Sequence, residues 1–189
     1  GALEVDLLPA LKAGGRRAEQ ACELLLDRWA GPLVNYLSRM TGCRAIGEEL
    51  AQEALARLIR EASVLRTAGS LKGWLWTVAT NLGRDHLRHR RFELASAPAA
   101  ARPAEAPGPD PLEAQELKDR VQTVLAHLAE PDRLCLLMKD VEELPYEILA
   151  EVLAISPETA RVRVHRARER FRDLYKTLDG DKELRHASA

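Results

Sequence analysis

The feature that most constrains the fold is a proline-rich segment at residues 95–111, which reads ASAPAAARPAEAPGPDP. It holds five of the ten prolines in the chain and almost no side chain that could contribute to a hydrophobic core. Proline lacks the backbone N–H that a helix or sheet uses and favours extended backbone. We therefore predict a semi-stiff linker here, with a separately folded unit on either side of it.

The length and composition fit two small helical domains. The chain has 189 residues, of which 46% are hydrophobic, 30% charged and 4% aromatic. A chain this rich in Ala, Leu, Arg and Glu and this poor in aromatic residues favours helix over sheet. The sequence predicts an all-α protein with four parts: a helical domain at residues 1–95, a flexible linker at 96–111, a helical domain at 112–178 and a frayed tail at 179–189.

The charges are segregated along the chain. A formal net charge of -1 argues against a nucleic-acid partner. Residues 72–91, however, hold five Lys or Arg against one acid, and residues 158–176 hold seven against three. Charge is screened over about 8 Å at physiological salt, so each cluster acts locally whatever the total. Two positive surfaces are predicted.

A helix-turn-helix is predicted at residues 144–175. The first helix spans 146–153, and Pro145 fits its first turn, where a missing N–H does no harm. After a short turn, Ser156 and Pro157 provide a hydroxyl cap and a proline at the first position of a second helix. Two helices joined by a turn of three or four residues form the helix-turn-helix signature.

The second helix of this motif has one apolar face and one charged face. Its apolar residues share one stripe, which is predicted to face the core: Ala160, Val164, Ala167, Phe171 and Leu174. The other face and its flanks carry residues able to reach DNA: Glu158, Thr159, Arg161, Val162, Arg163, His165 and Arg166. Arginine can fork onto guanine and valine can touch a thymine methyl in the major groove. An ordinary helix with a solvated charged face is the alternative; the cap, the turn and the separation of faces favour DNA contact.

A further helix, predicted at residues 71–88 after the cap Ser70, combines aromatic and basic residues. Its buried stripe is predicted to be Leu71, Leu75, Val78 and Leu82. The flanks and the solvent side are predicted to hold Lys72, Trp76, Thr77, Thr80, Asn81, Arg84 and Arg88. Such groups suit unpaired bases, which stack on flat side chains and offer their edges to polar groups. The alternative makes the two tryptophans core anchors; it is favoured for Trp74 and evenly balanced for Trp76.

Two earlier helices complete the first domain. Residues 19–40 carry apolar residues at helical spacing, Leu24 among them, and are predicted to form a core helix interrupted at Gly31-Pro32. Residues 48–61 are predicted to form a helix that buries Leu50, Ala54 and Leu58, or a neighbouring stripe through Leu55. The outer face of that helix is predicted to hold Glu48, Glu49, Gln52, Glu53, Arg57 and Arg60.

With these residues in view, the chain resembles a bacterial extracytoplasmic-function (ECF) sigma factor, a compact RNA polymerase specificity subunit with region 2 and region 4 domains. Residues 48–53 (EELAQE) and the helix at 71–88 resemble region 2, and residues 144–170 resemble region 4. Both blocks, in this order across a proline-rich linker, are specific for the family. The departures bear on promoter sequence more than on class: Glu49, where Asp is commoner, Leu55 for an aromatic, Pro145 for a hydroxyl cap, and Val162 at a position often small and polar.

The resemblance implies a protein that binds core RNA polymerase and directs promoter recognition, promoter opening and initiation. It assigns clamp binding to Glu48, Glu49, Gln52, Glu53 and Arg57. It assigns the -35 element to the helix from Pro157, and the -10 strand to residues 72–88 and the loop at 64–69. A cognate anti-sigma factor is an implied partner. The alternative is a helix-turn-helix regulator that never joins the polymerase, which leaves the acidic helix and the Trp/Asn/Arg helix unexplained.

The sequence argues against several other classes. No apolar run reaches the roughly 18 residues that span a bilayer, and no secretory leader is evident, so we expect a cytoplasmic protein without membrane insertion. No phosphate-binding glycine loop, zinc-ligand spacing or nucleophile–base pair occurs, so we expect no enzymatic activity, cofactor or metal. An obligate homo-oligomer is not expected either. Cys22, Cys43 and Cys135 are predicted to be structural thiols, with a redox role the less favoured alternative.

Overall fold

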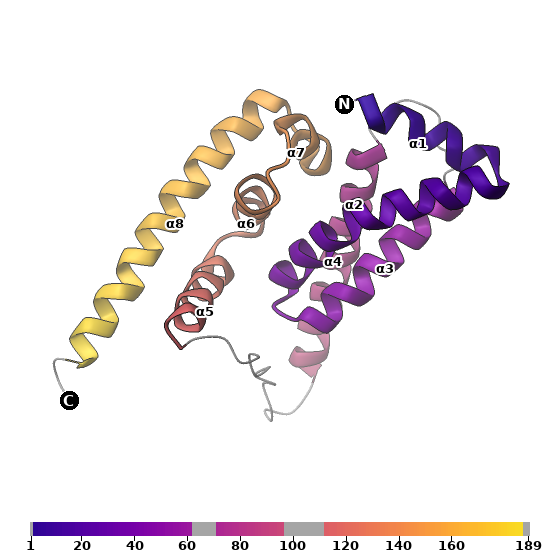
Figure 1. The fold of residues 1–189 in the computed structure, drawn as a ribbon. Helices are drawn as coiled ribbons and strands as arrows, with labels where there is room; N and C mark the ends of the chain where they lie inside the picture. The colour runs from indigo at the N-terminus through magenta and orange to yellow at the C-terminus, as the bar shows by residue number, and fades with distance from the viewer. Residues whose placement is uncertain (1, 62–70, 97–111, 187–189) are drawn as a thin grey trace.

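The computed structural model describes residues 2–61, 71–96 and 112–186, and no strand occurs in these ranges. The all-α prediction is confirmed for this part of the chain. The proline-rich segment from residue 97 to 111 and the loop at 64–69 lie outside the described residues. Figure 1 shows the helices before the linker gathered on one side of the molecule, and those after it on the other.

The first lobe consists of four helices: α1 (Ala2–Ala13), α2 (Gly15–Thr41), α3 (Arg44–Glu61) and α4 (Leu71–Ser96). The helix α1 was not predicted; it packs on α2 and α4 and buries Leu7. The prediction of a break at Gly31-Pro32 is wrong, because α2 continues through Pro32. Trp29 and Leu33 are buried on either side of Pro32, and this packing offsets the backbone hydrogen bond that proline removes.

The buried face of α2 is narrower than predicted. Leu24 was expected in the core, but its side chain is 60% exposed, whereas its neighbour Leu25 is 1% exposed. On α3 the buried residues are Gly47, Ala51, Ala54, Leu55 and Leu58, while Leu50 is only partly buried. The buried face therefore includes Ala54 and Leu58 of the first predicted stripe as well as Leu55 of the alternative.

A glycine allows α2 and α3 to approach closely. Gly47 is buried against Ser38, and a Cβ atom at Gly47 would lie 2.6 Å from the backbone nitrogen of Ser38 and 2.8 Å from its Cα. Backbone atoms cannot rotate away as a flexible side chain can. Gly47→Ala is therefore expected to lower the free energy of unfolding by about 3 kcal/mol, measured by urea denaturation, because the two helices must separate.

Gly31→Ala is the matched control for this substitution. Gly31 also lies within a helix, but apart from its chain neighbours and its own helix backbone nothing is within 4 Å of a Cβ atom built on it. Alanine has the higher helix propensity, but a Cβ before Pro32 is disfavoured in a helix, so the two effects oppose each other and this variant is expected to change stability by less than about 1 kcal/mol. Equal stability of the two variants would contradict the close approach of α2 and α3.

The second lobe comprises α5 (Leu112–His127), α6 (Glu130–Leu136), a π-helical turn η1 (Leu137–Val141), α7 (Tyr146–Leu153) and α8 (Pro157–His186). The helix-turn-helix is confirmed, since α7 ends at Leu153 and α8 begins at Pro157, as predicted. Ser156 caps α8: its Oγ accepts a hydrogen bond from the Thr159 backbone N–H at 3.1 Å. Ala154 closes α7 in the left-handed region, at φ 52°. The helix α8 continues to His186, past the residue where a frayed tail was expected.

The predicted core stripe of α8 is also confirmed. Ala160, Val164 and Ala167 are each 0% exposed, and Phe171 and Leu174 pack against the core while partly buried. This stripe fixes which side of α8 faces outward, and with it the orientation of every charged residue on the helix.

The two lobes pack against one another. The helix α4 contacts α7, and α2 contacts η1. Arg84 Nε on α4 donates to Glu130 Oε1 at the start of α6 over 2.5 Å, and Gln122 Nε2 on α5 donates to the Arg39 carbonyl at 2.8 Å. Buried residues of both lobes join in one hydrophobic cluster. The lobes therefore share a contact in addition to the linker.

Candidate nucleic-acid and polymerase interfaces

The outward face of α8 presents the residues predicted to contact DNA. Arg163 is partly buried, and the others are exposed: Glu158, Thr159, Arg161, Val162, His165 and Arg166. Val162 is an apolar side chain that is 51% exposed, as a contact to a thymine methyl requires. A hydrogen bond from its own backbone amide, and a second from Ser156, hold the pKa of Glu158 below its ordinary value, so Glu158 carries a negative charge at neutral pH.

A shallow hollow of about 320 Å³ lies beside this face, between α8 and the start of α6. Four of the predicted DNA-contacting residues line it: Thr159, Val162, Arg163 and Arg166. On its far side, the carboxylate of Asp132 is buried and accepts a hydrogen bond from Arg170. The hollow thus lies between the outward face of α8 and a wall where the carboxylate of Asp132 offsets the charge of Arg170.

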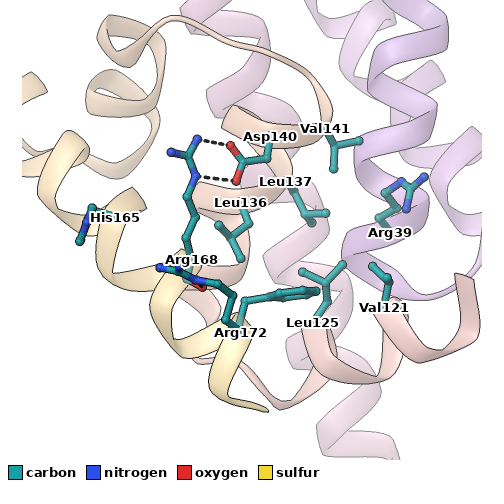
Figure 2. Close-up of a pocket in the computed structure, with 11 residues that line it drawn as sticks. Arg39, Val121, Leu125, Leu136, Leu137, Asp140, Val141, His165, Arg168 and Arg172 are labelled. Atoms are coloured by element: carbon teal, nitrogen blue, oxygen red, sulfur yellow. Dashed lines mark hydrogen bonds and ion pairs between the residues drawn. The ribbon is translucent and has the colours of Figure 1, made fainter. Parts of the chain in front are cut away.

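The turn η1 contacts α8 through an ion pair. Asp140 accepts two hydrogen bonds from Arg168, one of them from Nε at 3.0 Å. Figure 2 shows Arg168 turned toward Asp140 beside a second pocket, and His165 is one of the residues that line this pocket. His165 lies 3.6 Å from Glu169 on its own helix. Arg168 therefore orients the helix, and His165 stays on the open face.

The helix α4 groups some of the predicted base-contacting residues and separates others. Thr77, Asn81, Arg84 and Arg88 follow one another at intervals of three or four residues, so they form one stripe. Each is exposed or partly buried. Lys72 is partly buried and lies off this stripe, at the start of the helix. The structure therefore brings four of the six residues together.

Trp76 is not on the open face. The prediction that it lies toward solvent is wrong: its side chain is 1% exposed and meets Tyr36 edge to face, with ring centroids 4.9 Å apart. Thr80 is also buried, and its Oγ1 is 2.9 Å from the Tyr36 hydroxyl. Burial covers a wider arc of α4 than a single apolar stripe, because α4 packs on α2 and α3 within its own lobe and on α7 of the other lobe.

Trp74 takes the place that was predicted for Trp76. It is only partly buried, and it lies seven residues before Asn81 and fourteen before Arg88, an interval that returns to nearly the same face of a helix. Trp74 also packs against the hydrophobic core, so its prediction as a core anchor is confirmed in part. The seven-residue spacing was visible in the sequence and could have identified Trp74 as the aromatic residue of this face.

Acidic side chains hold two arginines of this face. Arg84 pairs with Glu130 of the second lobe, and Arg88 Nη2 lies 2.5 Å from Asp85 Oδ1. The Arg84 pair is partly buried and the Arg88 pair is exposed. A nucleic-acid strand on this face must compete with these carboxylates for the arginines.

The acidic face of α3 is organised by ion pairs. Glu53 Oε1 accepts hydrogen bonds from Arg57 Nε at 2.7 Å and from Arg60 Nη2 at 3.3 Å. The hydrogen bond from Arg57 and the charge of Arg60 hold the pKa of Glu53 below its ordinary value. Arg44 pairs with Glu48 at 2.8 Å. Glu49 and Gln52 are exposed between these pairs, so the predicted polymerase-binding residues share an accessible patch.

Glu142, next to η1, is a carboxylate in an unfavourable position. Its Oε1 is buried and has no hydrogen-bond partner among the residues described. Burial raises its pKa to about 7, and the charge of Arg39 on α2 only partly opposes this. Because the folded pKa is above the unfolded value, Glu142 favours the folded protein at low pH, and this contribution is lost as the pH rises from about 4.5 through 7.

Glu142→Gln is therefore expected to stabilise the protein at pH 8 by about 1–2 kcal/mol, and by much less at pH 5, since a neutral amide avoids the buried charge. This free-energy gain is smaller than that for a fully buried charge, because solvent reaches part of the carboxylate. Urea denaturation at the two pH values measures the difference. Glu147→Gln, an exposed position on α7, is the control and is expected to change stability equally at both pH values. A parallel response of Glu142→Gln would refute the buried charge.

The three cysteines are free thiols. Cys135 is buried, and burial raises its pKa to about 11, so it stays protonated at neutral pH. Burial also raises the pKa of Cys22. A raised pKa lowers the fraction of reactive thiolate, which agrees with a structural role for these two residues.

Comparison with known proteins identifies the family. Residues 25–93 match the family model of sigma-70 region 2, and residues 118–171 match that of sigma-70 region 4. The chain is 32% identical over 170 residues to the RNA polymerase sigma factor CarQ of Myxococcus xanthus, covering 86% of this chain and 93% of CarQ. The chain belongs to the ECF sigma factors. A sigma factor directs transcription initiation, and an independent helix-turn-helix regulator is not favoured.

Other relatives of this sigma factor agree with the assignment. The ECF sigma factor SigE of Mycolicibacterium smegmatis is 29% identical over 164 residues, and the match covers 85% of this chain and 63% of SigE. The sigma factor RpoE of Bartonella quintana, solved with the anti-sigma factor NepR, has the same fold, with a TM-score of 0.67 and 22% identity over 82% of this chain and 96% of RpoE. CnrH, solved with the cytosolic domain of CnrY, gives a TM-score of 0.68 at 19% identity over 94% of this chain and 98% of CnrH.

Within the described ranges, none of the helices combines the length and the apolar character needed to cross a membrane.

Proposed function

We propose that this sigma factor carries RNA polymerase to promoters whose two elements are read by different lobes. The two lobes correspond to domains at residues 1–95 and 112–178, which the linker at 96–111 joins. The observation that supports this most is that one chain holds an exposed base-reading helix, α8, and a second helix, α4, whose open face carries a tryptophan, an amide and two arginines.

The -35 element is read as a duplex by the outward face of α8. Arg161 and Val162 lie in its N-terminal half, which enters the major groove in helix-turn-helix proteins. Arg163 and Arg166 line the adjoining hollow and contact phosphates. Base edges supply the specificity, and the phosphates fix the register of the helix on the duplex.

The -10 element is held as a single strand by α4. Separating the strands costs about 1.4 kcal/mol of stacking for each base-pair step. A base stacked on an aromatic side chain returns about 1–3 kcal/mol, and Trp74 provides such a ring on the same face as the amide of Asn81, about two helical turns earlier. Promoter opening is therefore driven by binding, and the protein needs neither hydrolysis nor a cofactor; it is not an enzyme.

Binding of the strand is coupled to separation of the lobes. Arg84 and Glu130 form an ion pair across the lobe interface, 2.5 Å apart. A phosphate that takes Arg84 must displace Glu130, and two promoter elements apart along the DNA cannot be read by lobes that stay packed together. In the holoenzyme the linker spans the distance, since extended proline-rich chain covers roughly 3 Å per residue.

An anti-sigma factor is the proposed regulator. RpoE was solved with the anti-sigma factor NepR, and CnrH with the cytosolic domain of CnrY. In this chain a hollow of about 590 Å³ lies between the end of α2 and the second lobe, with apolar walls that include Val121, Leu125 and Leu136 (Figure 2). An amphipathic helix placed there would contact both lobes at once and hold them together.

Polymerase binding is tested at the acidic patch of α3. Glu49→Lys combined with Glu53→Lys is expected to weaken binding to core polymerase at least tenfold in a pull-down or anisotropy titration, because it reverses two charges of the interface. Glu19→Lys with Glu23→Lys makes the same charge change at exposed positions on α2 and is expected to bind like the parent. If the parent protein forms no complex with core polymerase, the proposed function is wrong. If only the control loses binding, the interface lies elsewhere.

A further inference from the structure

The ring of Tyr146 lies close to two cationic side chains, one of which belongs to α8. Tyr146 is the first residue of α7, and its ring centroid lies 4.7 Å from Lys139 Nζ and 5.4 Å from Arg161 Cζ. Both distances are within the range of about 6 Å over which an aromatic ring attracts a cation. Tyr146 is partly buried and Arg161 is exposed. The second lobe therefore fixes the Tyr146 ring, and the ring in turn restricts the outward-facing side chain of Arg161.

Residues of η1 and of the loop that follows η1 hold the ring in place. Lys139 belongs to η1 and also donates a hydrogen bond from Nζ to the Leu144 carbonyl at 2.9 Å, which ties the ammonium group close to the start of α7. Arg161 and Arg168 are seven residues apart on α8 and therefore lie on the same face, two turns apart. Lys139 supports the ring beside Arg161, and the next residue, Asp140, binds Arg168.

Contact through the ring leaves the hydrogen-bonding edge of Arg161 available. A guanidinium group that stacks on an aromatic face still has its N–H donors in its own plane, which is the geometry that recognises guanine O6 and N7 together. An unrestrained arginine adopts many rotamers, and it loses that freedom when it binds a base. A side chain held in advance loses less, and it binds the correct base more strongly relative to an incorrect one.

We infer that Tyr146, supported by Lys139, is a specificity-determining positioning residue that fixes Arg161 for the readout of one -35 base pair. This rests on the proposed function, in which α8 reads the -35 duplex. Tyr146 itself touches no base; it acts through Arg161.

The test uses holoenzyme assembled from core polymerase and full-length variants, bound to promoter duplexes in which each -35 base pair is changed in turn. Arg161→Ala is expected to abolish discrimination at one base pair. Tyr146→Leu is expected to reduce discrimination about threefold at that same base pair and to leave the others unchanged, and Tyr146→Phe, which keeps the ring, to behave like the parent. In an Arg161→Ala background, Tyr146→Leu is expected to have no further effect on discrimination.

Tyr175→Leu is the matched control. Tyr175 also carries an arginine, with Arg120 Cζ 5.6 Å from its ring centroid, but it lies toward the C-terminal part of α8, fourteen residues from Arg161. It is expected to change stability without changing base preference. If Tyr146→Leu does not fold, as judged by circular dichroism, Tyr146→Gln replaces it with the same expected result.

The outcomes separate this inference from the proposed function. If the parent holoenzyme shows no -35 preference at all, the proposed function fails. If the parent discriminates and Arg161→Ala relaxes one position, but Tyr146→Leu keeps the parental profile, the inference is overturned. It is also overturned if Arg161→Ala relaxes no position, or if Tyr146→Leu or its Gln replacement weakens binding to every duplex equally, as a loss of stability alone would.

Discussion

Trp76→Ala is expected to lower the free energy of unfolding by about 3–5 kcal/mol, the range measured when buried aromatic residues are truncated. Trp76 is 1% exposed and is among the largest fully buried side chains described. Its removal leaves Tyr36 without its edge-to-face partner and opens a cavity where α4 meets α2. Because the whole stability of a domain is about 5–15 kcal/mol, this loss is a large part of it. Urea denaturation followed by circular dichroism measures the change.

Two further substitutions identify the cause of that loss. Trp76→Phe keeps an aromatic ring against Tyr36 and removes an indole N–H that has no partner among the described residues, so it is expected to cost about 1 kcal/mol. Trp74→Ala is expected to cost less than Trp76→Ala, since Trp74 is only partly buried, and to weaken binding of an unpaired -10 strand to the holoenzyme. Loss of strand binding in Trp76→Phe but not in Trp74→Ala would contradict the assignment of the two tryptophans.

Arg161→Ala combined with Arg166→Ala is expected to weaken binding of the holoenzyme to a promoter duplex by about thirtyfold or more. Each arginine contributes about 1 kcal/mol or more through base or phosphate contacts. Loss of one phosphate contact at Arg166 also lowers the slope of log affinity against log salt by about 1. Both side chains are exposed, so the stability of the chain is expected to stay within about 0.5 kcal/mol of the parent.

The matched control for this pair is Arg16→Ala with Arg17→Ala. These residues are exposed at the start of α2, which Figure 1 shows on the opposite side of the molecule from α8. The control removes the same charge, so a general electrostatic effect would weaken both double variants equally. Equal loss in the two would show that α8 has no special role in duplex binding.

The helix-turn-helix could be predicted from sequence because its signals are local. Pro145 marks the start of α7, and Ser156 and Pro157 mark the start of α8. The apolar stripe of α8 then assigns every charged residue to a face without reference to the rest of the chain. Each of these signals lies within a few residues of the structure it specifies.

The open face of α4 could be predicted only in part, because helices distant in the sequence, in both lobes, contribute to its burial. Periodicity alone places Trp76 away from the apolar stripe, yet Tyr36, forty residues earlier, covers it. The pair Arg84–Glu130 joins residues 46 positions apart across the linker. Pairing over such separations depends on how complete helices pack, and the spacing of residues within one helix carries no record of it.

The close approach at Gly47 and the bracing of α8 by η1 were missed for a related reason. Glycine within a helix reads as a weakness in the sequence, and its value appears only when Ser38 of a neighbouring helix lies against it. The π-helical turn at 137–141 has no distinctive sequence pattern, although it supplies both the Asp140 contact to Arg168 and the Lys139 contact to Tyr146.

The central claim is that this chain makes core RNA polymerase start transcription at promoters it selects. The direct measurement is run-off transcription with purified core polymerase and a library of promoter sequences, with and without the protein. We expect defined transcripts only when the protein is added, from templates that share one duplex element and one opened element at a fixed separation. Failure to start transcription at any template, with polymerase that is active with another sigma factor, would contradict the account.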